Sequence, residues 1–61
     1  MIIEEFADGI AFIKDDVEIA FYSNIAGHIR FENSNIILVE DFITIARNVE
    51  NYIKRIGIDY D

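Results

Sequence analysis

The side chains that could do chemistry in this chain are few, and their spacing matches no known catalytic arrangement. There is no cysteine and only one histidine, which removes a thiol nucleophile and the Cys/His set of a structural zinc site. Ser23 and His28 could join an acid in a nucleophilic triad, but neither Ser23 nor Ser34 sits in a nucleophile-elbow pattern. Both serines fall in expected turns, where a hydroxyl commonly bonds the local backbone. We therefore expect no enzyme activity, no catalytic residue and no cofactor.

Three carboxylates within four residues, Asp15, Asp16 and Glu18, raise the question of a metal site. Oxygen ligands of this kind suit calcium or magnesium, but the EF-hand spacing and its turn glycine are absent. We interpret the group as solvated charge at a hairpin and expect no metal. His28 has no second imidazole to join it and is expected at the surface or at a strand end.

The acidic residues are concentrated in the first two thirds of the chain. The net charge is −7, and residues 1–41 hold nine acidic and two basic residues, so they account for 2 − 9 = −7. Residues 42–61 hold three of each. Nucleic-acid binding depends on lysine and arginine that neutralise phosphates, so direct binding of DNA or RNA is not expected. A basic surface on another protein would be attracted instead.

Apolar residues alternate, or form short runs, between residues 2 and 39, and turn-forming clusters interrupt them every six to ten residues. This rhythm predicts an antiparallel meander with strands at about 2–7, 10–14, 17–22 and 28–32. Asp8-Gly9 and Asp15-Asp16 are expected hairpin turns, the first because Gly9 can take a positive φ. Residues 36–39 fit either a fifth strand or the first turn of the following helix.

The period then changes to that of an amphipathic helix over about 41–56. Asp41 is expected to cap its start, Lys54 and Arg55 to lie at its negative end, and Gly57 to end it. The predicted fold is α+β, with an antiparallel β-meander of four or five strands packed against one C-terminal amphipathic α-helix. We expect one domain, residues 1–61.

One helix can cover only one face of a sheet, and this chain has apolar residues to spare, at 52% of its length. A domain of this size buries only about 60% of the surface that its unfolded chain exposes. Alternation places one apolar set toward the helix: Ile2, Phe6, Ile10, Phe12, Val17, Ile19, Phe21, Ile29 and Phe31. A second set points away from it: Ile3, Ile13, Ala20 and Tyr22, with Ile37 and Val39 as further candidates. The second set predicts self-association, most simply as a homodimer, whereas a curled sheet or small barrel would bury both sets in one molecule.

No apolar run approaches the roughly 20 residues of a membrane-spanning helix. Glu4, Glu5 and Asp8 interrupt the start of the chain, where a signal peptide would be basic and then apolar. A cytoplasmic protein without membrane contact is therefore expected.

Two functional hypotheses follow. The first is a small acidic non-enzymatic protein-binding module that blocks a basic or nucleic-acid-binding surface of a host protein. Inhibitors encoded by phages and mobile elements are often of this size and charge, which is an association and not a motif. Its expected partner-binding residues are Glu4, Glu5, Asp15, Asp16 and Glu18 for attraction, with Ile13 and Tyr22 for buried contact.

The second hypothesis is a structural or assembly subunit that self-associates through the apolar second face of its sheet. Salt separates the two, because charge-driven docking weakens steeply as salt rises and apolar association does not. A plainer reading of the carboxylates is that they keep a small, apolar-rich domain soluble.

Overall fold

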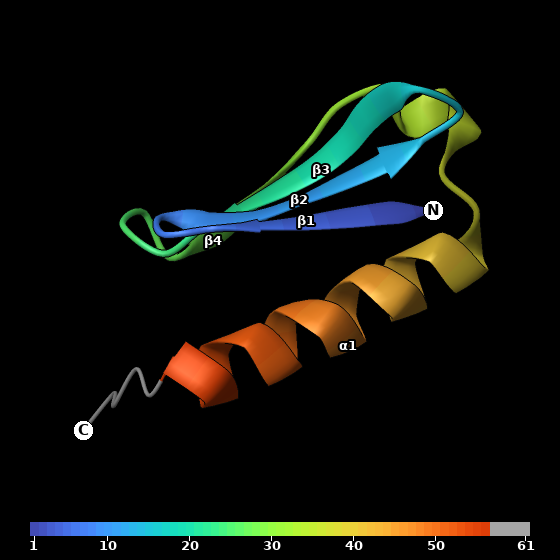
Figure 1. Cartoon of the computed structure of the whole chain (residues 1–61). Helices are drawn as coiled ribbons and strands as arrows, with labels where there is room; N and C mark the ends of the chain where they lie inside the picture. The colour runs from blue at the N-terminus through green and yellow to red at the C-terminus, as the bar shows by residue number, and fades with distance from the viewer. Residues whose placement is uncertain (57–61) are drawn as a thin grey trace.

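The computed structural model describes residues 1–56 of the chain. Its elements in order are β1 (Ile2–Phe6), β2 (Gly9–Lys14), β3 (Val17–Ser23), β4 (His28–Phe31), the 3-10 helix η1 (Ser34–Ile36) and α1 (Val39–Ile56). The strands form one antiparallel sheet in the order β1-β2-β3-β4, and α1 lies across one face of it (Figure 1). The predicted α+β class, a meander packed against one C-terminal helix, is confirmed. The expected helix end at Gly57 lies outside the described residues.

Helix α1 begins at Val39, two residues earlier than predicted. Asp41 is the third residue of the helix, and its Oδ2 accepts a hydrogen bond from the backbone N–H of Leu38 at 2.9 Å. In a capping box the side chain of the third helical residue bonds to the backbone N–H of the N-cap residue in the same way. Residues 36–39 are therefore the end of η1 and the start of α1. Within residues 1–56 there is no fifth strand.

The two hairpin turns differ in backbone conformation, because only the second has residues with positive φ. Asp15 and Asp16 both have positive φ, 53° and 64°, as a type I′ turn requires, and this turn was predicted at these residues. The first turn is Ala7-Asp8, one residue earlier than predicted, because Phe6 pairs with Gly9. Gly9 thus opens β2 in an extended conformation, and the expected positive φ there is wrong.

Glycine is needed at position 9 because a side chain would not fit there, and not because of its backbone conformation. A Cβ at this position would lie 2.1 Å from the carbonyl oxygen of Tyr22 and 2.6 Å from the ring of Phe21. Among the described glycines it is Gly27, in the β3–β4 loop, that has a positive φ, of 75°.

A β-bulge on β3 decides which side chains face the helix. Phe12 pairs with Ala20, but Ile13 pairs with Glu18, so that Ile19 is an extra residue on β3. Ile19 and Ala20 are consequently both fully buried beneath α1. From Ala20 onward the alternation is shifted by one residue relative to its phase before the bulge.

The predicted division of apolar residues between the two faces is therefore wrong on β3, and it is also wrong on β1. Ile3 pairs with Phe12 and so faces the helix, whereas Ile2 and Phe6 face away from it. The residues placed on the wrong face are Ile2, Ile3, Phe6, Ala20, Phe21 and Tyr22. On β1 the cause is the two-residue turn itself, because it pairs each even-numbered residue of β2 with an odd-numbered residue of β1, so that Ile3 and not Ile2 shares a face with Phe12.

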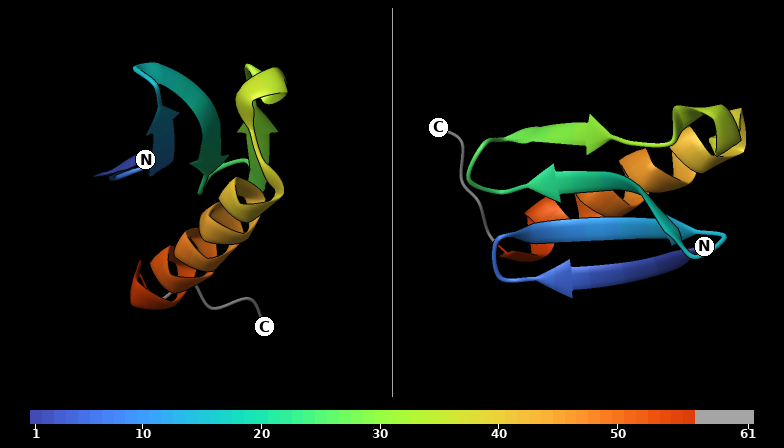
Figure 2. Two further views of the ribbon diagram at one scale, coloured as in Figure 1. Left: turned by 90° about the vertical axis from the view of Figure 1, so that its right-hand side faces the viewer. Right: turned by 90° about the horizontal axis from the view of Figure 1, so that it is seen from above.

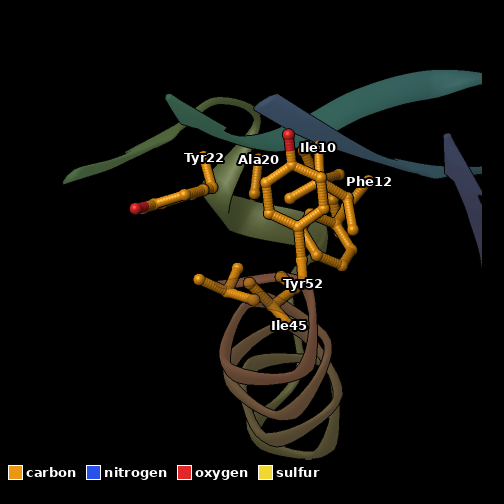
Figure 3. Packing of buried hydrophobic residues seen from close by; sticks show 8 residues of the cluster. Ile10, Phe12, Ala20, Tyr22, Ile45 and Tyr52 are labelled. Atoms are coloured by element: carbon orange, nitrogen blue, oxygen red, sulfur yellow. The ribbon is translucent and has the colours of Figure 1, made fainter. Parts of the chain in front are cut away.

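The core forms where α1 packs on the sheet, and Figure 3 shows it at close range. Its buried members are Ile10, Phe12, Ile19, Ala20 and Tyr22 from the sheet and Ile45, Val49 and Tyr52 from the helix. Tyr52 is 2% exposed, and its hydroxyl donates to the carbonyl of Phe6 at 2.8 Å and accepts from Nδ2 of Asn24 at 3.2 Å. Its ring packs edge-on against Tyr22, with centroids 6.2 Å apart. Tyr52 therefore joins α1 to the ends of β1 and β3 without leaving its own polar atom unsatisfied.

Candidate protein-binding surfaces

The face of the sheet opposite α1, called the outer face below, is built from three rows of side chains that the strand register sets. The middle row crosses all four strands: Glu4, Ala11, Phe21 and Arg30. Toward the β2–β3 hairpin lies the row Ile2, Ile13 and Glu18, and toward the other end lies the row Phe6, Gly9, Ser23 and His28. No described segment covers this face, as the right-hand view of Figure 2 shows, with α1 behind the sheet.

The centre of the outer face is apolar and hollowed. An open hollow of about 350 Å³ lies over Ala11, which is only 6% exposed and forms its floor. Phe6 and Phe21 stand beside it with ring centroids 6.5 Å apart. Phe6 and Ile2 are 49% and 56% exposed, which is high for large apolar side chains. An exposed apolar surface of this kind is characteristic of an interaction site.

Opposite charges flank the outer face on its two edge strands. On β4 the guanidinium of Arg30 lies 5.9 Å from the Phe21 ring centroid, and its Nε is 3.1 Å from Glu32. Its longer pair with Glu18, at 3.8 Å, is also solvent-exposed. On β1, Glu4 makes no ion pair with any other residue of 1–56. The outer face thus carries an unpaired carboxylate on one edge and an exposed guanidinium on the other.

A second surface lies at the end of the molecule where the β2–β3 hairpin meets the start of α1. Lys14 joins them, because its Nζ is 2.6 Å from Oδ2 of Asp41 and 3.0 Å from the carbonyl of Ile36. The hydrogen bond from Lys14, with that from the Leu38 backbone, holds the pKa of Asp41 below its ordinary value. The hairpin and the helix start are therefore fixed relative to each other.

This end, called the acidic end below, has a surplus of carboxylates. Its charged side chains are Asp15, Asp16, Glu18, Glu32, Glu40 and Asp41 against Lys14 and Arg30, which gives 2 − 6 = −4. Asp15, Asp16 and Glu40 are exposed and have no basic partner among the described residues. Leu38 and Val39, beside Glu40, are 53% and 77% exposed. The acidic end therefore combines unpaired carboxylates with apolar side chains.

The sheet residues predicted to bind a partner fall into two groups. Glu4, Ile13 and Glu18 lie on the outer face, and all three line its hollow. Asp15 and Asp16 lie at the tip of the acidic end. The structure does not gather the five into one cluster, because the hairpin tip lies beyond the edge of the outer face.

Two other predicted positions lie elsewhere. Glu5 faces the helix side of β1, where its Oε2 accepts a hydrogen bond from Arg55 at 2.6 Å and raises the pKa of that guanidinium. Tyr22 is 3% exposed and packs beneath α1, so its predicted position on the outer face is wrong. Because of the bulge at Ile19, Tyr22 faces the helix and Phe21 is the aromatic residue of β3 on the outer face.

Sequence reasoning missed Phe6, Ala11 and Phe21 as members of the outer face. Residues 19–22 are all apolar, so the pattern there fits either face and no local signal marks the bulge. Gly9 carried an indirect signal, since a glycine inside a strand pattern can mark the close approach of a neighbouring side chain.

Within residues 1–56 no group of three or more acidic or histidine side chains is placed to hold a metal ion. In the same part of the chain no helix has the length and apolar character needed to cross a bilayer. Comparison of the chain with protein-family models, with curated proteins and with solved structures found no match.

Proposed function

We propose that this chain is a non-enzymatic protein-binding module whose acidic end docks on a basic surface of another protein and blocks it. The observation that carries the proposal is the position of Asp15, Asp16 and Glu40. These carboxylates are exposed at one end of the molecule, and none has a basic partner in residues 1–56. Lysine and arginine side chains of a partner would supply the missing counter-charges.

The acidic end is also pre-organised for such a contact. The type I′ turn holds Asp15 and Asp16 in defined backbone conformations, and the Lys14–Asp41 ion pair fixes the hairpin against α1. A surface that is already ordered loses less conformational entropy on binding. Leu38 and Val39 add exposed apolar surface that a docked partner would bury.

The basic surface that fits best is one that otherwise binds nucleic acid. Such surfaces carry clustered lysine and arginine, and their affinity for phosphates falls with rising salt. A protein that covers them with carboxylates competes with nucleic acid directly. Heparin, a polyanion, should therefore displace this chain from its partner.

A pair of charge-matched variants tests the role of the acidic end. D15N/D16N removes two carboxylates there, and asparagine retains the tolerance for positive φ that the turn needs. D8N/E50Q removes two carboxylates elsewhere, at the β1–β2 turn and in the C-terminal half of α1. The partner is first captured from a lysate of the source cells with the wild-type chain and purified, and binding is then measured by calorimetry.

At roughly 150 mM salt we expect D15N/D16N to bind about tenfold more weakly, and D8N/E50Q to stay within about twofold of wild type. Wild-type affinity should fall steeply between about 50 and 300 mM salt. Equal affinity of D15N/D16N and wild type, or an affinity that does not change with salt, would show that the acidic end is not the docking surface.

A further inference from the structure

The middle row of the outer face is complementary to itself, and we propose that two copies of this chain stack their outer faces as a two-fold dimer whose axis runs parallel to the strands. The proposal goes beyond the docking of the acidic end and does not depend on it. It rests on the register of four residues, Glu4, Ala11, Phe21 and Arg30, across the sheet.

An axis parallel to the strands places β1 of one copy over β4 of the other, and β2 over β3. Positions along the strands are unchanged by this rotation, so each row meets the same row of the second copy. Glu4 then lies over Arg30 of the second copy, and Ala11 lies over Phe21 of the second copy. Both contacts occur twice, once on each side of the axis.

The charges distinguish this arrangement from the other simple way to stack the two faces. An axis in the plane of the interface but perpendicular to the strands would place β1 over β1 and β4 over β4. Glu4 would then face Glu4, and Arg30 would face Arg30. Like charges held opposite each other are unfavourable, so the pattern selects the parallel axis.

Shape supports the same pairing. Ala11, Phe6 and Phe21 of the same copy line the hollow, so a second copy would meet an apolar depression at the centre of the face. Two stacked sheets lie about 10 Å apart, a distance at which large and small side chains interdigitate. In the neighbouring row, Phe6 would lie over the exposed His28 of the second copy.

The expected dimer is weak, because the face is small. A four-stranded face with strands of this length measures about 20 Å by 17 Å, well below the ~800 Å² per partner of a standard interface. Each chain also carries a charge of −7, so the two copies repel at long range. We expect a dissociation constant on the order of micromolar, which tightens as salt screens that repulsion. This salt dependence is opposite in sign to that of docking by the acidic end.

Charge reversal at the two edge positions tests the dimer. E4R places a second arginine over Arg30 of the other copy, and R30E places a second glutamate over Glu4, so each variant alone should dimerise at least about tenfold more weakly than wild type.

An equimolar mixture of E4R and R30E restores both charge pairs. The arginine introduced by E4R meets the glutamate introduced by R30E, and on the other side of the axis the native Arg30 of the first variant meets the native Glu4 of the second. Sedimentation equilibrium should therefore show the mixture dimerising at least as well as wild type. Because each variant alone associates weakly, recovery in the mixture also demonstrates that both are folded.

The neutral variant E4Q tests the axis. With the parallel axis it loses an attraction and weakens the dimer, whereas with the perpendicular axis it removes a repulsion and strengthens it. The proposal is overturned if wild type is a monomer at about 1 mM, if E4R dimerises as tightly as wild type, if the mixture fails to recover, or if E4Q strengthens association. D15N/D16N serves as the control, because it should dimerise no more weakly than wild type.

Discussion

The two faces of this sheet both carry large apolar side chains but differ in how these are covered. On the helix side, Phe12 and Ile19 are fully buried beneath α1. On the outer face, Phe6 is 49% exposed and Ile2 is 56% exposed, although both belong to the same sheet. A single 18-residue helix is enough to build a core on one face but leaves the other to water or to another protein. The stability of the fold should therefore depend on the first face and its associations on the second.

The largest expected effect in this comparison comes from truncating matched phenylalanines on the two faces. F12A should destabilise the fold by about 3–5 kcal/mol, because it opens a cavity in the core. That is comparable with the whole stability of a domain this small, so F12A should be unfolded at 25 °C. F6A should cost only about 1 kcal/mol. Urea denaturation followed by circular dichroism, at a concentration low enough to keep the chain monomeric, measures both.

The contrast between the faces would fail if F6A destabilised the chain as much as F12A. It would also fail if F12A remained folded with a normal urea midpoint. In either case the apolar residues of the outer face would contribute to the core of the monomer.

A smaller effect is expected from adding one methyl group at each of two glycines. G9A places a Cβ 2.1 Å from the backbone oxygen of Tyr22, so the β1–β2 hairpin must shift, at a cost of about 2–3 kcal/mol. G27A meets no atom within 4 Å and only has to hold alanine at a φ of 75°, at a cost of about 1 kcal/mol. Thermal unfolding should rank the stabilities as wild type, then G27A, then G9A. The reverse order would mean that backbone strain in the β3–β4 loop outweighs crowding beneath Phe21.

The smallest expected effect is the pH dependence of the Lys14–Asp41 ion pair. The folded-state pKa of Asp41 is lowered, so its contribution to stability is complete above the unfolded pKa and is lost as pH falls through the folded value. The melting temperature of wild type should therefore exceed that of D41N by a constant amount above about pH 5. The difference should shrink below about pH 4. A difference that grows on acidification would contradict the assignment, and E50Q, which alters an exposed i,i+4 pair, is the control.

Some features of this structure could be predicted from short stretches of the sequence alone. The hairpin turn at Asp15-Asp16 and the helical period after Asp41 were both expected, and the structure contains them. Each depends on residues within a few positions of one another in the chain. The sequence left residues 36–39 open between a strand and a first helical turn, and α1 starts at Val39 with Asp41 capping it from inside its first turn.

The amino-acid sequence by itself determined the kinds of element, their order and the concentration of negative charge in the part of the chain that forms the sheet. Those properties follow from side-chain period, turn chemistry and composition, which are local. Only the tertiary structure decided that Tyr22 is buried beneath α1 and that Phe21 lies on the outer face. The bulge at Ile19 is set by how β3 pairs with β2 while both pack under α1, and one extra residue reverses the faces of everything after it.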